Sequence, residues 1–286
     1  MDESSSVILV GAPRSGTNML RDVLTSINGV FTWPCDEINY IWRHGNVWYP
    51  SDEIPAERAN PAVKNYIQQR FSDIQEKYSA NVVVEKTCAN SLRVTFVDAV
   101  VPSAKYIFIY RDGIDATGSA KERWTAKLDI PYLLEKVRFV PKADLPYYAV
   151  RYFWARIYRL ISSEKRLAFW GPKLDNMQEI LQKHSLNEVC ALQWQRCVDK
   201  ADEALSAMPE GKVIRVCYED FVQQPGKELG RILEFLGKDV PEADIAEAVK
   251  DVSPRSLGKG RKALGESEVA NLEKLVGDSL KRYGYL

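Results

Sequence analysis

The stretch that decides the fold reads Val7-Ile8-Leu9-Val10-Gly11-Ala12-Pro13-Arg14-Ser15-Gly16-Thr17-Asn18-Met19-Leu20. Its first four residues form an unbroken apolar run, which is typical of a strand buried on both faces of a parallel sheet. Gly11 and Gly16 then bound a tight turn, and the apolar residues that follow recur at helical spacing. Free backbone N–H groups meet the positive end of a helix in such a turn, so the stretch predicts an anion-binding loop.

The loop departs from an ATP-binding phosphate loop at a decisive position. The Walker pattern places Lys and then Ser or Thr after its second glycine, for the phosphates and for Mg²⁺. Here Thr17 and Asn18 follow Gly16. The cationic role therefore passes to Arg14, whose planar guanidinium suits an oxyanion without a metal. The pattern disfavours a P-loop kinase or NTPase, and a strand-to-helix turn that binds nothing is the other alternative.

Composition narrows the class of protein. The 286 residues carry 39 basic and 39 acidic side chains, so we expect no general nucleic-acid or membrane surface. Two histidines and five scattered cysteines offer little for a zinc site, so we expect no metal and free thiols in a reducing compartment. The polar, acidic start and the lack of an apolar run near the ~20 residues of a membrane span predict a soluble cytoplasmic protein.

Short apolar runs alternate with helical patterns along the chain, which predicts an α/β fold with three layers and a central parallel sheet. Residues 126–184 break this rhythm with aromatic and basic residues and predict a helical insertion, either a lid or acceptor-binding wall or simply aromatic core. No repeat or linker divides the chain, so residues 1–286 are expected to form a single domain. Beyond 7–10, strands are expected at 81–85, 105–110 and 212–217, and helices at 61–78, 91–101, 114–125, 187–208 and 226–236.

A second candidate anion site follows the predicted strand 105–110. Arg111 stands at its carboxyl end, where ligands bind in open parallel sheets. Ser119 and Arg123 are four residues apart and so share one helix face. One hydroxyl and two guanidinium groups can hold a second phosphate there. A surface helix with ordinary ion pairs, such as Arg111 with Asp115, is the alternative.

The two motifs together resemble the sulfotransferase family, and the resemblance extends over nearly the whole chain. The loop at 11–18 is similar to the family's Pro-Arg-Ser-Gly-Thr motif, which grips the 5′-phosphosulfate of 3′-phosphoadenosine 5′-phosphosulfate (PAPS). Arg111 and Ser119 keep the eight-residue offset of the family's element for the 3′-phosphate. The loop looks closer to tyrosylprotein and bacterial carbohydrate sulfotransferases than to the cytosolic phenol and steroid type. The resemblance implies a P-loop-NTPase-like sulfotransferase fold, PAPS as co-substrate and adenosine 3′,5′-bisphosphate as product.

Three later segments are similar to family elements in the same order. Residues 84–93 look like the Lys-Thr-Pro segment, with Cys88 in place of the usual proline, and residues 216–221 resemble a Tyr-Glu-Asp-Leu element. Residues 256–262 resemble the nucleotide-covering loop, with Gly260 where tryptophan is common. The resemblance implies donor contacts from Arg14, Ser15, Gly16, Thr17, Asn18, Arg111, Ser119, Arg123, Tyr218, Ser256, Leu257, Lys259, Gly260 and Arg261.

Sulfuryl transfer requires a base for the acceptor proton, which the resemblance assigns to Glu37. This residue follows the first helix and a short β-like stretch at 30–33, and it resembles the glutamate that follows the same loop in tyrosylprotein sulfotransferases. Asp36 is the alternative if the correspondence shifts by one residue. An acidic pair after a turn is otherwise an ordinary helix N-cap, which would have no catalytic role.

The transferring group and the leaving phosphate need positive charge. Lys86 ends a predicted strand, and the resemblance implies that its ammonium reaches the oxygen between phosphate and sulfate; a salt bridge to Glu85 or Asp112 is the alternative. Arg14 is expected to bridge the 5′-phosphate and the sulfuryl oxygens, with the N–H groups of residues 15–18. Asn18 stands where the family usually has Thr or Ser, and its amide can donate an equivalent hydrogen bond.

No motif in the sequence identifies the acceptor. The aromatic and basic residues of 126–184 suit a saccharide, a glycolipid headgroup, a peptide tyrosine or an aromatic small molecule, because aromatic faces stack on all of these. The resemblance to carbohydrate sulfotransferases favours a hydroxyl or amine on a saccharide or glycolipid. A protein of the same fold that binds a nucleotide or glycan without catalysis is the remaining alternative.

Overall fold

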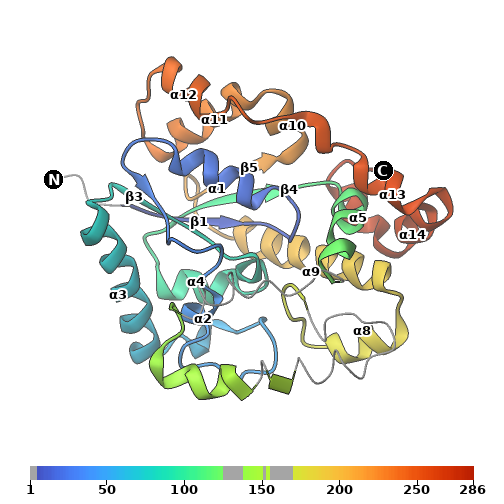
Figure 1. Cartoon of the computed structure of the whole chain (residues 1–286), viewed down its shortest axis with the longest axis horizontal. Coiled ribbons are helices and arrows are strands. Elements are labelled where there is room, and N and C mark those ends of the chain that lie inside the picture. The colour runs from blue at the N-terminus through green and yellow to red at the C-terminus, as the bar shows by residue number, and fades with distance from the viewer. Residues whose placement is uncertain (1–4, 125–137, 151–152, 155–169) are drawn as a thin grey trace.

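Five parallel strands form the centre of the protein (Figure 1). The computed structural model describes residues 5–124, 138–150, 153–154 and 170–286. The sheet has the order β2-β3-β1-β4-β5, so the first strand lies in the middle. The strands are β1 (Ser5–Val10), β2 (Val30–Phe31), β3 (Val82–Lys86), β4 (Lys105–Tyr110) and β5 (Val213–Cys217).

Helices cover both faces of this sheet, as the sequence predicts. In Figure 1, α1 (Thr17–Thr25), α11 (Pro225–Leu236) and α12 (Glu242–Ala248) lie above the sheet, and α3 (Pro61–Tyr78), α4 (Val94–Val100) and α9 (Leu186–Ser206) lie below it. The α-helices are α1 (Thr17–Thr25), α2 (Asn39–Trp42), α3 (Pro61–Tyr78), α4 (Val94–Val100), α5 (Gly113–Trp124), α8 (Met177–Lys183), α9 (Leu186–Ser206), α10 (Tyr218–Gln223), α11 (Pro225–Leu236), α12 (Glu242–Ala248), α13 (Lys259–Leu264) and α14 (Glu266–Arg282). The 3-10 helices are η1 (Ala56–Arg58), η2 (Cys88–Leu92), η3 (Lys142–Asp144) and η4 (Pro254–Ser256).

The central strand β1 is buried on both faces, which confirms the interpretation of its apolar run. Ile8 and Val10 belong to one core cluster, which includes residues of α3, α4 and α9. Val7 and Leu9 belong to a second cluster with α1 and α11. Side chains alternate between the two faces of a strand, so each residue of β1 supports one layer. The three-layer α/β prediction is therefore correct.

The prediction of one helix over residues 91–101 is wrong at its beginning. The chain forms η2 first, and α4 starts only at Val94, because Arg93 has a non-helical backbone (φ −142°, ψ 36°). The Arg93 side chain is buried, with hydrogen bonds to the side-chain oxygens of Asn90 and Asn39 at 2.9 and 2.6 Å. Burying a guanidinium requires such partners, and their positions decide where the helix breaks.

The predicted insertion at 126–184 lies partly outside the described residues, which leave out 126–137, 151–152 and 155–169. Within its described part, residues 145–150 are helical, η3 precedes them and α8 follows later. The insertion stays a prediction, as does the single domain.

Two glycines let α13 lie directly on α5. A Cβ built on Gly118 would be 2.3 Å from the carbonyl oxygen of Gly260, and one built on Gly260 would be 2.0 Å from that of Asp115. Residues 256–262, expected as a loop, are therefore partly helical. No larger side chain than hydrogen fits at 260 in this packing, which is the physical reason for a glycine where the family often has tryptophan.

Candidate active site

The loop between β1 and α1 has the backbone of an anion cradle. Arg14 and Gly16 both have left-handed φ angles, 68° and 87°, which turn successive N–H groups inward. Within the described part of the chain no side chain caps α1, so the N–H groups of its first turn can bind a ligand. The Ser15 side chain is fully buried, and its hydroxyl has no hydrogen-bond partner among the described residues. These groups fit a bound phosphate or sulfate.

The two sequence motifs meet in space. Arg14 Nε donates to Ser119 Oγ at 2.9 Å, across 105 residues of sequence. Arg111 donates to the carbonyl oxygen of Arg14 at 3.0 Å. Because the Ser119 hydroxyl accepts from Arg14, it keeps its own hydrogen for another acceptor. The loop and the second motif thus form one continuous cationic site.

Arg111 is held at the carboxyl end of β4 by several groups at once. It forms the ion pair with Asp115 that the sequence offered as an alternative, and it donates to the carbonyl oxygen of Ser256 at 3.2 Å. Its guanidinium carbon lies 4.5 Å from the centre of the Tyr218 ring, and the Tyr218 hydroxyl is 2.5 Å from Ser256 Oγ. The guanidinium is therefore held in position by groups of the protein itself.

The residues near the C-terminus that are expected to contact the donor have different roles in the structure: some attach α13 to the protein and others are exposed. Gly260 N–H donates to Asp115 Oδ1 at 2.6 Å, and the Arg261 side chain pairs with Asp112 and Glu273, so both attach α13 to the rest of the protein. Leu257 packs against the core cluster on the α1 side of the sheet. Lys259 and Arg123 are exposed.

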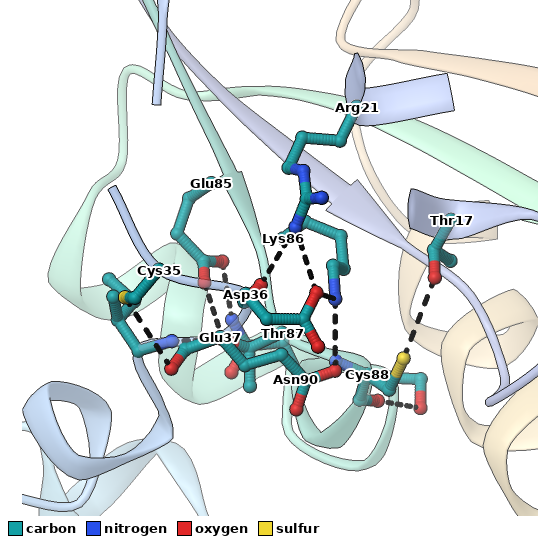
Figure 2. A network of polar contacts seen from close by, with 12 residues as sticks. Thr17, Arg21, Cys35, Asp36, Glu37, Glu85, Lys86, Thr87, Cys88 and Asn90 are labelled. Atoms are coloured by element: carbon teal, nitrogen blue, oxygen red, sulfur yellow. Dashed lines mark hydrogen bonds and ion pairs between the residues drawn. The ribbon is translucent and has the colours of Figure 1, made fainter. Parts of the chain in front are cut away.

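Lys86 lies beside the loop with its ammonium buried between two carboxylates (Figure 2). Its Nζ is 3.1 Å from Asp36 Oδ1 and 3.2 Å from Glu37 Oε1. Burial alone lowers the pKa of Lys86, but the nearby negative groups, Glu37 and Asp36 among them, outweigh this and raise the pKa above its ordinary value. The ammonium stays charged at neutral pH. These partners replace the Glu85 or Asp112 salt bridge that the sequence left open.

Asp36 and Glu37 have different surroundings, although they are neighbours in sequence. Asp36 forms an ion pair with Arg21 at 2.9 Å as well as with Lys86, so two cations compensate its charge. Glu37 pairs with Lys86 and accepts the backbone N–H of Cys88 at 3.3 Å. A proline at 88 has no N–H and would not make this contact. Glu37 is the carboxylate with less cationic compensation.

The thiol of Cys88 is buried beside the loop. Burial is the main reason that the pKa of Cys88 is raised well above its ordinary value, so the thiol stays neutral. Its sulfur lies 3.6 Å from Thr17 Oγ1. The side chain therefore fills space between the loop and η2.

Sequence reasoning did not identify Arg21, Thr87 and the second role of Asp115. Arg21 is one helical turn after Thr17, a spacing that could have placed it on the loop side of α1. Asp115 was considered only as a partner of Arg111. Thr87 lies inside the Lys-Thr segment but has no chemistry that marks it.

Residues 5–124, 138–150, 153–154 and 170–286 contain no group of three or more His, Cys, Asp or Glu side chains able to hold a metal ion. Over the same residues, none of the helices combines the length and the apolar character needed to cross a membrane.

The chain is similar to proteins of known family. Residues 4–268 match the sequence profile of the sulfotransferase domain. A bovine (Bos taurus) protein, Sulfotransferase 1A1, is 30% identical over 94 residues, which is 33% of this chain and 31% of that protein. The chain thus matches only about a third of the length of this curated relative.

Solved structures share the fold at low sequence identity. The sulfotransferase domain from the curacin biosynthetic pathway has a TM-score of 0.56 and 13% identity, with 97% of this chain and 99% of that one covered. Sulfotransferase STF9 from Mycobacterium avium has a TM-score of 0.54 and 13% identity, with 99% and 78% covered. Since the profile covers most of the chain, the protein belongs to the family of sulfotransferase domains, a family of enzymes.

Proposed function

We propose that the protein transfers a sulfuryl group from PAPS to a hydroxyl or amine acceptor. The observation that carries the proposal is the hydrogen bond from Arg14 Nε to Ser119 Oγ, 2.9 Å long. It joins a phosphate-type loop to a second cationic element, so one ligand with two anionic groups can contact both. A donor with a 3′-phosphate and a 5′-phosphosulfate has this character.

Each end of the donor has residues suited to it. The N-terminus of α1, the buried Ser15 hydroxyl and Arg14 fit the 5′-phosphosulfate. Arg111 and Ser119 are the candidates for the 3′-phosphate, with Arg111 held by Asp115 and Tyr218. The remaining donor contacts, from Ser256, Leu257, Lys259 and Arg123, rest on the family resemblance.

In the proposed reaction, Glu37 accepts the proton of the acceptor hydroxyl as the acceptor oxygen forms its bond to sulfur. The bond between sulfur and the 5′-phosphate oxygen breaks, and its electron pair stays on the leaving bisphosphate. Lys86 and Arg14 stabilise this negative charge, which is the main contribution a protein makes to such a transfer. The 3.2 Å contact between Lys86 and Glu37 supports the assignment, because it brings the proposed base and the proposed cation into one site. No metal is needed in this scheme.

The acceptor is proposed by class alone, as a saccharide or glycolipid headgroup ahead of a peptide tyrosine or small molecule. This preference rests on the resemblance of the Pro-Arg-Ser-Gly-Thr loop, residues 13–17, to that of carbohydrate sulfotransferases.

The test has two stages. Calorimetry should show that adenosine 3′,5′-bisphosphate binds more tightly than ATP with Mg²⁺. Sulfur-labelled PAPS should then yield a labelled product with at least one member of a panel of saccharides, glycolipids, tyrosine peptides and phenols. Hydrolysis of ATP that depends on Mg²⁺ would instead favour the NTPase alternative. Binding of the bisphosphate with no labelled product from any acceptor would favour a non-catalytic binding protein.

A further inference from the structure

Three consecutive residues, the last of β3 and the two after it, hold the segment that carries Glu37. Lys86 Nζ and Cys88 N–H contact Glu37 Oε1 at 3.2 and 3.3 Å. Between them, Thr87 Oγ1 accepts the backbone N–H of Ile38 at 3.2 Å. Two contacts therefore fix the carboxylate and the third fixes the backbone beside it (Figure 2).

The Thr87 hydroxyl can accept from Ile38 in this geometry because its own hydrogen points elsewhere. It donates to Glu85 Oε1 at 2.6 Å, and the Thr87 and Glu85 side chains are both fully buried. A hydroxyl has one hydrogen, so the partner that takes it decides where the lone pairs point. Glu85 is that partner, which links a buried carboxylate to the backbone next to the proposed base.

Glu85 is suited to this task because both of its oxygens face donors. Oε2 accepts from Asn90 Nδ2 at 2.8 Å, and Asn90 cannot turn over freely, since its Oδ1 accepts from Arg93 Nε at 2.9 Å. A carboxylate satisfies Thr87 and Asn90 together. A protonated carboxyl or a glutamine has a donor on one side and leaves one of the two without an acceptor.

We propose that Glu85 and Thr87 are positioning residues for the proposed base, acting through the chain Glu85 Oε1, Thr87 Oγ1 and Ile38 N–H to fix the backbone beside Glu37. This inference rests on the proposed function and adds residues to it that touch neither donor nor acceptor. Neither residue takes part in proton transfer. Loss of the chain lets the Glu37 segment shift, and small shifts of a catalytic group are costly to rate.

The charge state of Glu85 adds a pH dependence. Burial raises the pKa of Glu85 to about 7, against the opposing effects of the Thr87 hydrogen bond and of the charges on Arg93 and Lys86, the two cations that face it. Protonation below this pH replaces one acceptor oxygen by a donor, so either Thr87 or Asn90 loses its acceptor on Glu85. The turnover number of the wild type is therefore expected to fall as pH drops through about 7.

The test compares Thr87→Val, Thr87→Ser and Glu85→Gln with the wild type, using sulfur-labelled PAPS and the fastest acceptor of the panel. Thr87→Val keeps the shape of the side chain but removes the hydroxyl, so kcat should fall about 10- to 100-fold. Thr87→Ser keeps the hydroxyl and should recover most of the loss. Glu85→Gln should lower kcat similarly and remove the decline of kcat between pH 8 and pH 6. Affinity for adenosine 3′,5′-bisphosphate should be unchanged in all three.

Melting temperature and bisphosphate affinity separate a local effect from misfolding. The inference is overturned if folded Thr87→Val keeps wild-type kcat, if Thr87→Ser is as slow as Thr87→Val, or if Glu85→Gln keeps the wild-type pH profile. A wild-type protein that forms no sulfated product with any acceptor overturns the proposed function instead. The two failures are thus distinguishable.

Discussion

Lys86 and Glu37 form an ion pair, with Nζ 3.2 Å from Oε1, although they lie 49 positions apart in sequence. The lysine is buried and the glutamate is partly exposed, and Asp36 also compensates the charge of the lysine. We expect Lys86→Ala to lower kcat by ~10² to 10³, the usual effect of removing one preorganised electrostatic donor. Steady-state kinetics with PAPS measures this, with Lys250→Ala as the control because Lys250 is an exposed lysine just after α12 that forms an ion pair with Glu247. A near-normal kcat in Lys86→Ala would refute the assigned role.

The two neighbouring carboxylates should respond differently to loss of charge. Glu37→Gln is expected to abolish transfer and to leave bisphosphate affinity nearly intact, because Gln is a poor proton acceptor of the same shape. Asp36→Asn should have a smaller effect on kcat, since Asp36 is held by Arg21 and Lys86. The measurements are kcat and calorimetric affinity for both variants. The opposite ranking would assign the base to Asp36.

Arg111 should discriminate between nucleotides. Arg111→Ala is expected to weaken binding of adenosine 3′,5′-bisphosphate by about 10- to 100-fold, the usual range for a charge-assisted hydrogen bond. Adenosine 5′-phosphate should be affected much less, apart from the loss of the bond from Arg111 to the Arg14 carbonyl. Calorimetry with the two ligands provides its own control. Equal losses for both would mean that Arg111 only braces the loop.

The glycine contact between α5 and α13 makes a prediction about stability. Gly118→Ala places a Cβ about 2.3 Å from the Gly260 carbonyl, so α13 must move, and the free energy of unfolding should fall by about 1 to 3 kcal/mol. Gly230→Ala is the matched control, because Gly230 lies within α11 with nothing near its Cβ position. It should raise stability by about 0.5 to 1 kcal/mol. Urea unfolding measures both, and equal shifts would contradict the contact.

Buried Glu85 should make stability depend on pH in a definite direction. Burial raises its pKa from about 4.5 to about 7, so the folded protein binds this proton more tightly than the unfolded chain does. The resulting stabilisation is present below pH 4.5 and is lost as pH rises to 7, about 3 kcal/mol at this order of magnitude. Urea unfolding of the wild type and Glu85→Gln at several pH values measures it. We expect the variant to gain stability relative to the wild type over this range, and a constant difference would exclude the raised pKa.

Much of the architecture follows from local patterns. The limits of α3 match those predicted from the sequence, because Asn60 and Pro61 define its start and apolar residues recur along one face. The sequence predicts the β1 loop because its glycines bound a tight turn. It predicts the position of Arg111 because ligands bind at the carboxyl ends of parallel strands. The sequence predicts that Arg14 and Ser119 bind the same ligand, but it does not predict their direct hydrogen bond.

Other features depend on contacts between distant residues and have no local signal. Arg93 breaks a helical pattern because Asn39, far away in sequence, accepts its guanidinium. The packing of α13 on α5 requires two glycines 142 positions apart, and neither is marked as special by its neighbours. Arg21 and Thr87 likewise gain their roles only from the position of residues 36–38.

Cys88 stands where the family usually has proline, and its backbone amide is used as a hydrogen-bond donor. Where the usual proline restricts the chain, this protein has a residue that can donate, and the donor is used on Glu37 at 3.3 Å. The backbone at position 88 is thus less restricted than with proline, but it makes an additional hydrogen bond. Compared with the family pattern, position 88 differs in its side chain. The hydrogen bond to Glu37, however, comes from the main chain and does not involve the thiol. Cys88→Ala should therefore keep the hydrogen bond to Glu37, whereas Cys88→Pro should lose it, because proline has no N–H.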